Sequence, residues 1–179
     1  MKRSFIEKVL KYNIGQHDSE ISGVSIDSRN LKKGELFVAV PGKQIDGHMF
    51  VKEALDKGAA AVLVSQDVGL KSNRLIRVAD TTKALGQIAS AWRDEFDPLL
   101  IGITGSNGKT TVKELTLQVL TDCFGKDQVL GTIGNLNNHL GVPLTLLRLC
   151  PTHRYAVVEM GMNHPYEIAY LSHLAKPDI

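Results

Sequence analysis

Residues 99–114 read LLIGITGSNGKTTVKE, and this stretch indicates how the chain around it folds. Its apolar start at 99–101 is typical of a buried strand, and the pattern after Lys109 is typical of a helix. A run of Gly, Ser, Asn and Thr residues lies between them. A glycine-rich turn of this kind points backbone N–H groups at an anion, beside the positive end of the helix dipole. The stretch therefore predicts a phosphate-binding loop between a strand and a helix.

The residue types in this loop suit a nucleotide with Mg²⁺. Gly105 and Gly108 let the backbone turn and approach a ligand without a Cβ in the way. Lys109 supplies a point charge for the outer phosphates, and Thr110 supplies a hydroxyl that can ligate Mg²⁺. The common pattern G-x-x-x-x-G-K-[ST] requires a glycine five residues before Gly108, where this chain has Ile103. A strand-to-helix turn without a ligand is the alternative, and the complete strand–loop–Lys-Thr–helix context disfavours it.

Strand-like and helix-like segments alternate along the chain, which predicts an α/β fold with mostly parallel sheets. Because Asp97-Pro98 ends a helix, we place a domain boundary there. Residues 1–97 then form a small N-terminal α/β domain, and residues 98–179 form the first part of an incomplete P-loop parallel-sheet domain. The predicted strands are 23–29, 34–40, 59–65, 75–79, 99–104, 128–132 and 155–161, and the predicted helices are 5–10, 48–57, 81–96, 109–123, 143–149 and 165–175. On the helix 109–123, the side chains expected to point inward are Val112, Leu115, Val119 and Leu120.

Composition excludes several classes of function. Hydrophobic residues make up 43% and charged residues 22% of the chain, which is ordinary for a globular protein. A net charge of +2 without a long basic run argues against nucleic acid or a membrane surface as a partner. Cys123 and Cys150 lack metal-ligand spacing and are too few for a disulfide framework. Glu7 and Lys8 interrupt any signal-peptide core, and no apolar stretch is long enough to span a membrane, so we expect a cytoplasmic location without membrane insertion.

Several stretches resemble the Mur ligase superfamily, which also includes folylpolyglutamate synthetase. TGSNGKTT at 104–111 is similar to the nucleotide loop of that family, and residues 25–65 resemble the N-terminal domain shared by its third and fourth ligases. GNLNNHLGVPLTLLRL at 134–149 and YAVVEMGMNHPYEI at 155–168 resemble the fourth ligase, which adds D-alanyl-D-alanine. The resemblance extends from about Ile21 to Ile179. The last motif departs from the family pattern, because Tyr166 stands where a glycine usually precedes the glutamate.

The resemblance implies an ATP-dependent amide ligase of peptidoglycan precursor synthesis. Such an enzyme joins D-Ala-D-Ala to UDP-MurNAc-tripeptide through an acyl phosphate, with ATP and Mg²⁺. Lys109 and Glu159 would be catalytic, and Thr110 and Glu159 would be the metal ligands. Glu159 is the only carboxylate in the apolar strand YAVVEMG and lies near its C-terminal end, where open α/β sheets place their ligands. A glutamate paired with a surface lysine is the alternative. The expected nucleotide contacts are Thr104, Gly105, Ser106, Asn107, Gly108, Lys109, Thr110 and Thr111.

Contacts to the UDP-sugar substrate are also implied by the resemblance. The expected set is Ser28, Arg29, Gly42, Lys43, Asp46, Gly47, His48, Asn137 and Asn138. Arg29 suits a diphosphate because a guanidinium group binds two oxygens at once. A turn capped by Asp27 or Ser28 explains Ser28 and Arg29 almost as well. Turn chemistry is an equal alternative for the asparagines. His164, Glu167 and His173 suggest a metal cluster, but Pro165 and the lack of a further ligand favour helix capping.

The chain ends at AKPDI, where a further strand is expected to begin. Family members continue there with the rest of the central domain and a C-terminal domain. We therefore expect the full-length protein to be a monomer, and these 179 residues alone to bind ligands without ligating them and to self-associate. Two alternatives remain. One is the preceding ligase, which adds the third amino acid and which GNLNNHLGVP disfavours; the other is a stand-alone P-loop nucleotide-binding module.

Overall fold

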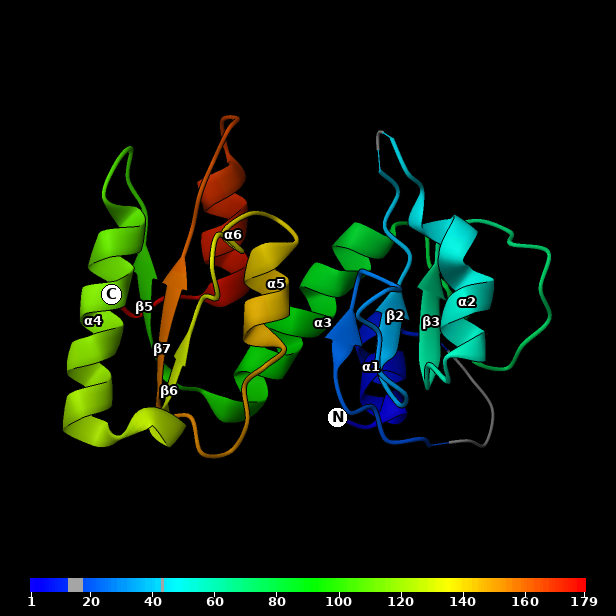
Figure 1. Ribbon diagram of the computed structural model, residues 1–179, viewed down its shortest axis with the longest axis horizontal. Coiled ribbons are helices and arrows are strands. Elements are labelled where there is room, and N and C mark those ends of the chain that lie inside the picture. The colour runs from blue at the N-terminus through cyan, green and yellow to red at the C-terminus, as the bar shows by residue number, and fades with distance from the viewer. Residues whose placement is uncertain (13–17, 43) are drawn as a thin grey trace. The chain divides into compact units, whose positions relative to one another are not determined.

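The computed structural model describes residues 1–12, 18–42 and 44–179, which form two compact units, Met1–Ile88 and Ala89–Ile179 (Figure 1). Helix α3 (Thr81–Phe96) contains the division between the units. The domain boundary predicted near Asp97 falls at the end of this helix, where Asp97 adopts a positive φ of 44° before Pro98. That boundary stays a prediction. Lys43, one of the expected substrate contacts, lies outside the described residues.

The first unit is built on a four-stranded parallel sheet in the order β1-β2-β3-β4. Its strands are β1 (Val24–Ser25), β2 (Leu36–Val38), β3 (Ala61–Val64) and β4 (Leu75–Arg77), and its further helices are α1 (Arg3–Leu10), η1 (Gly47–Phe50) and α2 (Val51–Asp56). Every residue of β2 and β3 is buried, as the continuous apolar runs predict for strands covered on both faces. Asp80 starts α3 as predicted, because its Oδ1 accepts the Lys83 N–H at 3.0 Å.

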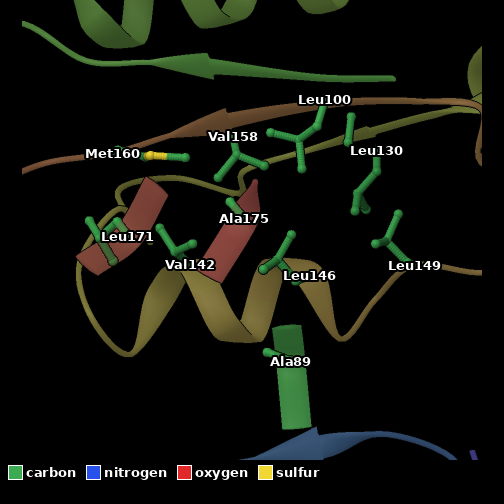
Figure 2. Packing of buried hydrophobic residues seen from close by; sticks show 11 residues of the cluster. Ala89, Leu100, Leu130, Val142, Leu146, Leu149, Val158, Met160, Leu171 and Ala175 are labelled. Carbon is green, nitrogen blue, oxygen red and sulfur yellow. The ribbon is translucent and has the colours of Figure 1, made fainter. Parts of the chain in front are cut away.

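The second unit contains a three-stranded parallel sheet in the order β5-β7-β6. Its strands are β5 (Leu99–Ile103), β6 (Val129–Gly131) and β7 (Tyr155–Glu159), and its helices are α4 (Lys109–Phe124), η2 (Lys126–Gln128), α5 (Gly141–Leu146) and α6 (Glu167–Ala175). Leu100 and Leu130 flank Ala156 in register, and this row packs toward α5 and α6 (Figure 2). Helix α4 covers the opposite face, where a Cβ on Gly131 would meet Leu117 at 2.5 Å. The parallel α/β fold is therefore confirmed.

The last residues of the chain add to the free edge of β5. The Asp178 N–H donates to the Leu100 carbonyl at 2.8 Å, and the Gly102 N–H donates to the Ile179 carbonyl at 2.8 Å. These groups of β5 point away from β7, because backbone groups alternate in direction along a strand. The pairing agrees with the strand expected to begin at Asp178.

The inward face predicted for α4 is wrong. Val112, Leu115 and Val119 are 51%, 63% and 61% exposed, and only Leu120 of the four predicted residues is half-buried. The helix instead turns Thr110, Lys113 and Leu117 toward the sheet: Thr110 bonds to Glu159, Lys113 bonds to the Thr132 carbonyl, and Leu117 packs over Gly131. Both stripes have helical spacing, so periodicity alone could not choose between them. The observed orientation is the one in which Thr110 and the fully buried Lys113 form hydrogen bonds.

Replacing Tyr166 with glycine is expected to stabilise the fold by about 1 kcal/mol, which raises Tm by a few degrees. Tyr166 precedes α6 with a φ of 70°, in the left-handed region that disfavours a Cβ, and the residue is 87% exposed. The ring therefore buries little area to offset the strain. Thermal and urea unfolding measure the change. Tyr166→Ala is the matched control, because it removes the ring but keeps the Cβ; an equal gain from alanine, or none from glycine, contradicts the strain argument.

Candidate functional site

The loop Thr104–Gly108 leaves the carboxyl end of β5 and enters α4. Gly105 and Gly108 have φ values of 145° and 75°, which side chains with a Cβ rarely adopt. Gly108 is the residue that caps α4, and a Cβ there would meet no atom within 4 Å, so the loop opens into free space. The sequence-predicted turn is thus present, and both glycines are required by backbone conformation.

Unused backbone donors line this loop. Among the described residues, no protein acceptor receives a hydrogen bond from any N–H between Gly105 and Thr111. The residues from Thr104 to Gly108 are exposed, and the free N–H groups of the first turn of α4 join them. Converging backbone donors at the positive end of a helix are the features that bind phosphate oxygens.

Lys109 adds a positive charge to the same loop. Its Nζ donates to the Gly105 carbonyl at 2.7 Å, which folds the side chain back over the loop. Within the described part of the chain, Lys109 forms no ion pair with a carboxylate. The ammonium charge is therefore available to an anionic ligand at the loop.

Glu159 lies at the carboxyl end of β7, beside the start of α4. It is 2% exposed, its Oε2 accepts the Thr110 hydroxyl at 3.0 Å and its Oε1 accepts the Asn137 amide at 2.8 Å. Glu159 forms no ion pair among residues 1–12, 18–42 and 44–179, which disfavours the lysine-pairing alternative. The structure therefore brings together the two side chains expected to hold Mg²⁺.

The donor set at Thr110 and Glu159 fits Mg²⁺. A hydroxyl and a carboxylate are hard oxygen ligands, and Mg²⁺ usually takes only one or two protein ligands and completes its shell with water and phosphate oxygens. The described residues contain no group of three or more His, Cys, Asp or Glu side chains that could hold a metal. A site of this kind therefore suits a cation that arrives with a nucleotide better than a permanently bound one.

Two residues that the sequence did not single out position this carboxylate. The Thr132 Oγ1 accepts the Glu159 N–H at 3.0 Å, and the fully buried Lys113 donates to the Thr132 carbonyl at 3.2 Å. Lys113 also pairs with Glu114 at 2.6 Å. A lysine in a polar helical segment gave no sequence signal, because only the fold shows that it is buried.

The asparagines of the 134–149 motif have different positions. Asn137 bonds to Glu159, whereas the Asn138 Oδ1 accepts the N–H groups of Leu140 and Gly141 at 3.1 and 2.9 Å, at the start of α5. The Asn138 side chain thus performs the turn chemistry that was the alternative to substrate binding. Asn135 is exposed, and its carbonyl accepts the Asn137 N–H at 2.8 Å.

Glu167 caps the start of α6. Its Oε2 accepts the N–H groups of Asn163 and His164 at 2.6 and 3.1 Å, and these bonds lower the pKa of the Glu167 carboxyl. His173 lies in the last turn of the same helix. The capping interpretation of these residues agrees with the structure.

In the first unit, Ser28 and Arg29 follow β1. Ser28 is buried, and its hydroxyl donates to Glu53 Oε2 at 3.1 Å. Arg29 is 85% exposed, and its Nε and Nη2 bind the carboxylate of Asp27 at 2.9 and 2.8 Å. The hydrogen bonds from Arg29 hold the pKa of Asp27 at about 2. Asp27 thus fixes the orientation of the exposed Arg29 guanidinium through Nε and Nη2, and Nη1 does not take part in these two hydrogen bonds.

The turn after β2 is braced by His48. Its Nδ1 donates to Asp46 Oδ1 at 2.6 Å, and its Nε2 accepts the N–H of Ser65, directly after β3, at 2.9 Å. The ring is buried and both nitrogens are used, so His48 positions the turn. Gly47 passes so close to Val40 that a Cβ would lie 2.7 Å from its backbone nitrogen. Gly42 precedes the same turn, where a Cβ would lie 2.3 Å from the Ile45 carbonyl oxygen.

These turns lie at the carboxyl-terminal end of the first sheet. Parallel strands all end on the same side of a sheet, so the segments after β1, β2 and β3 are neighbours there. Of the expected substrate contacts, Arg29 is exposed there, whereas Ser28 and His48 are buried.

Two family models and several curated relatives match the sequence of this chain. Residues 20–93 match a model described as Mur ligase family, catalytic domain, and residues 103–179 match the Mur ligase middle domain. The UDP-N-acetylmuramoyl-tripeptide–D-alanyl-D-alanine ligase of Buchnera aphidicola is 45% identical over 91% of this chain and 35% of its own length. The Escherichia coli ligase of the same name is 41% identical over 98% of this chain and 38% of its own length.

Solved structures lead to the same family. MurF from Acinetobacter baumannii superposes with a TM-score of 0.84 at 35% identity, over 97% of this chain and 38% of that one. MurF from Thermotoga maritima in complex with ADP gives a TM-score of 0.78 at 35% identity, over 87% of this chain and 36% of that one.

The chain spans a little over a third of the length of the curated relatives it matches. Across the described residues, no helix combines the length and apolarity that a membrane span requires. Both matched models come from one family, and they cover both units of the chain. The chain therefore belongs to the Mur ligase family, within which it is similar to the MurF ligases.

Proposed function

We propose that these residues provide the ATP-binding loop and the UDP-binding turns of a ligase that joins D-Ala-D-Ala to UDP-MurNAc-tripeptide. The observation that carries the proposal is the row of unused N–H donors from Gly105 to Thr111, with Lys109 beside it. The names of the relatives support the choice of substrates. The ADP complex of the Thermotoga maritima MurF supports an adenine nucleotide as the ligand of the loop.

The proposed reaction has two steps. The terminal carboxylate of the tripeptide attacks the γ-phosphorus of ATP, which forms an acyl phosphate and releases ADP. The amine of D-Ala-D-Ala then attacks the acyl carbon, which forms the amide and releases phosphate and a proton. Phosphoryl transfer depends mainly on positioning and charge neutralisation, which are the tasks of the loop N–H groups and of Lys109.

Glu159 and Thr110 would hold Mg²⁺, which neutralises charge on the phosphate oxygens when it is bound. Asn137 and Thr132 hold the Glu159 side chain and backbone in place through hydrogen bonds of 2.8 and 3.0 Å. We assign Asn137 to this positioning task, and Asn138 to the start of α5. Direct contacts of either asparagine with the sugar-peptide remain part of the proposal.

In the first unit, we assign Arg29 to the diphosphate of the UDP substrate. Its exposed guanidinium is pre-oriented by Asp27, which reduces the entropy lost on binding. His48 and Asp46 hold the neighbouring turn from Gly42 to Gly47 in a defined conformation. The nucleotide sites of the two units are proposed separately.

Two other functions are less well supported. The preceding ligase of the pathway shares the fold: a UDP-N-acetylmuramoyl-L-alanyl-D-glutamate–2,6-diaminopimelate ligase gives a TM-score of 0.60 at 22% identity. The relatives at 40–45% identity carry the D-alanyl-D-alanine ligase name instead. A stand-alone nucleotide-binding module is disfavoured because the likeness to these ligases extends through both units. We also propose a cytoplasmic location, where ATP is available, and a monomeric full-length enzyme.

NMR titration of the 179-residue chain with UDP-MurNAc-tripeptide is expected to shift amide signals near 25–29 and 42–48. Mg-ATP is expected to shift those of 104–111. Arg29→Ala should weaken binding of the UDP substrate about tenfold, because it removes a charge-assisted contact. Arg154→Ala, an exposed arginine of the second unit, is the matched control. UDP-substrate shifts confined to residues after 98 contradict the assignment.

A further inference from the structure

A thiol and an imidazole meet at the edge of the second unit opposite the nucleotide loop. Cys150 and His153 belong to the turn that connects α5 to the start of β7. The nucleotide loop leaves the carboxyl-terminal end of β5, whereas this turn leads to the amino-terminal end of β7, on the opposite side of the parallel sheet. An open cavity of about 420 Å³ lies at this edge, and its lining includes Lys126, Asp127, Arg148, Cys150, Thr152 and His153.

The turn places the imidazole where it can accept the thiol proton. His153 Nδ1 lies 3.3 Å from Cys150 Sγ and accepts the Cys150 backbone N–H at 3.1 Å. That N–H makes Nδ1 an acceptor and puts the ring proton on Nε2. The His153 N–H also donates to the Cys150 carbonyl at 3.0 Å, so backbone and side chain hold the same arrangement. The Thr152 hydroxyl lies 3.2 Å from Sγ.

The surroundings keep this imidazole neutral. Burial lowers the pKa of His153, the charge of Arg148 lowers it further, and the charge of Asp127 acts in the opposite direction. A lowered pKa leaves Nδ1 unprotonated at neutral pH, so its position 3.3 Å from the Cys150 sulfur, and not a high basicity, is what allows it to take the thiol proton. Cys150 itself is half-buried, so its sulfur is reachable from the cavity.

The charge of the cavity selects the sign of the ligand. Its lining has two cations, Lys126 and Arg148, and one carboxylate, Asp127, which leaves a net charge of +1 with His153 neutral. Neither cation forms an ion pair within the described part of the chain, and the Arg148 guanidinium donates to the Gly131 carbonyl at 3.0 Å. This cavity is not a metal site, because the described residues contain no group of three or more His, Cys, Asp or Glu side chains that could hold a metal ion.

We propose that Cys150 is a thiol-exchange site for anionic low-molecular-mass disulfides, with His153 as the base. The Cys150 sulfur attacks one sulfur of the disulfide, a new S–S bond forms, and the old S–S bond breaks. The thiol proton passes to His153 Nδ1 and then to the departing thiolate, so the products are a mixed disulfide on Cys150 and one free thiol. Lys126 and Arg148 attract the carboxylates of the incoming molecule. This site is independent of the proposed ligase function.

Cys123 is a built-in comparison, because it is an exposed free cysteine on α4. Cys123→Ser leaves only Cys150, and Cys150→Ser leaves only Cys123. We treat each variant with oxidised glutathione and follow the addition of one glutathionyl group by intact-protein mass spectrometry. Cys150 is expected to react about tenfold faster than Cys123, as a positioned base allows. Equal rates, or faster reaction at Cys123, overturn the proposal.

Two further variants in the Cys123→Ser background separate the roles of base and charge. His153→Gln is expected to slow the reaction of Cys150 about tenfold with oxidised glutathione and with cystamine, a cationic disulfide. Arg148→Gln is expected to slow only the reaction with oxidised glutathione. Thermal unfolding checks that each variant is folded, and unfolding of His153→Gln leaves the Arg148→Gln comparison as the test. No loss of rate in either folded variant refutes the assigned roles.

Discussion

Replacing Lys109 with alanine is expected to weaken binding of Mg-ATP by about 2 kcal/mol, or about thirtyfold in Kd. The Lys109 ammonium lies over the loop at 2.7 Å from the Gly105 carbonyl and forms no ion pair among the described residues. It therefore contributes its charge to the bound phosphates without first breaking an ion pair. Isothermal titration calorimetry on the 179-residue chain measures the loss.

The control for this variant is Lys83→Ala, which removes the same charge from a mostly exposed lysine of the first unit. It is expected to leave the affinity for Mg-ATP within about twofold of wild type, because Lys83 is largely exposed and solvent and salt screen its charge. Equal affinities for Lys109→Ala and wild type, with both folded, would place the nucleotide elsewhere.

Replacing Glu159 with glutamine is expected to remove the Mg²⁺ dependence of ATP binding. Wild type should bind ATP at least about tenfold more tightly with Mg²⁺ than with EDTA, whereas the variant should show almost no difference. Glutamine has the same shape, and its amide can accept from Asn137 and donate to the Thr110 hydroxyl. The substitution therefore removes the charge while it keeps both hydrogen bonds.

Glu95→Gln is the matched control, because it removes one negative charge from an exposed position of the second unit. Its Mg²⁺ dependence should equal that of wild type. Urea unfolding verifies that Glu159→Gln remains folded, because the buried site must not collapse for the comparison to hold. If Glu159→Gln keeps the full Mg²⁺ effect, the metal is held by the phosphates alone or by other residues.

Much of the fold follows from local patterns. The runs at 59–65 and 99–104 predict buried parallel strands, because strands covered on both faces are continuously apolar. Asp80 predicts the start of α3, because its carboxylate satisfies a free N–H of the first turn. Gly105 and Gly108 predict the loop, because few residues adopt a positive φ. In each case, the physical cause lies within a few residues of the signal.

The orientation of α4 could not be predicted in the same way. Its stripe Val112–Leu115–Val119 is more apolar than the stripe that faces the sheet, yet the buried side chain is that of Lys113. A buried lysine is tolerated because a carbonyl of Thr132 and a carboxylate of Glu114 receive its ammonium group. Those acceptors come from another segment and from the helix itself, so hydrophobic periodicity does not reveal them.

By itself, the sequence determined the strand–loop–helix element, the parallel α/β class and the likeness to the Mur ligases. These depend on residue type and spacing over short stretches. Only the tertiary structure decided that Glu159, Thr110 and Asn137 share one cluster, that His48 joins its turn to the segment after β3, and that burial lowers the pKa of His153 beside Cys150. The contacts depend on the order of the strands in the sheet, which decides which strand ends and turns are neighbours. The pKa shift depends on burial in the folded chain. No local sequence pattern contains either kind of information.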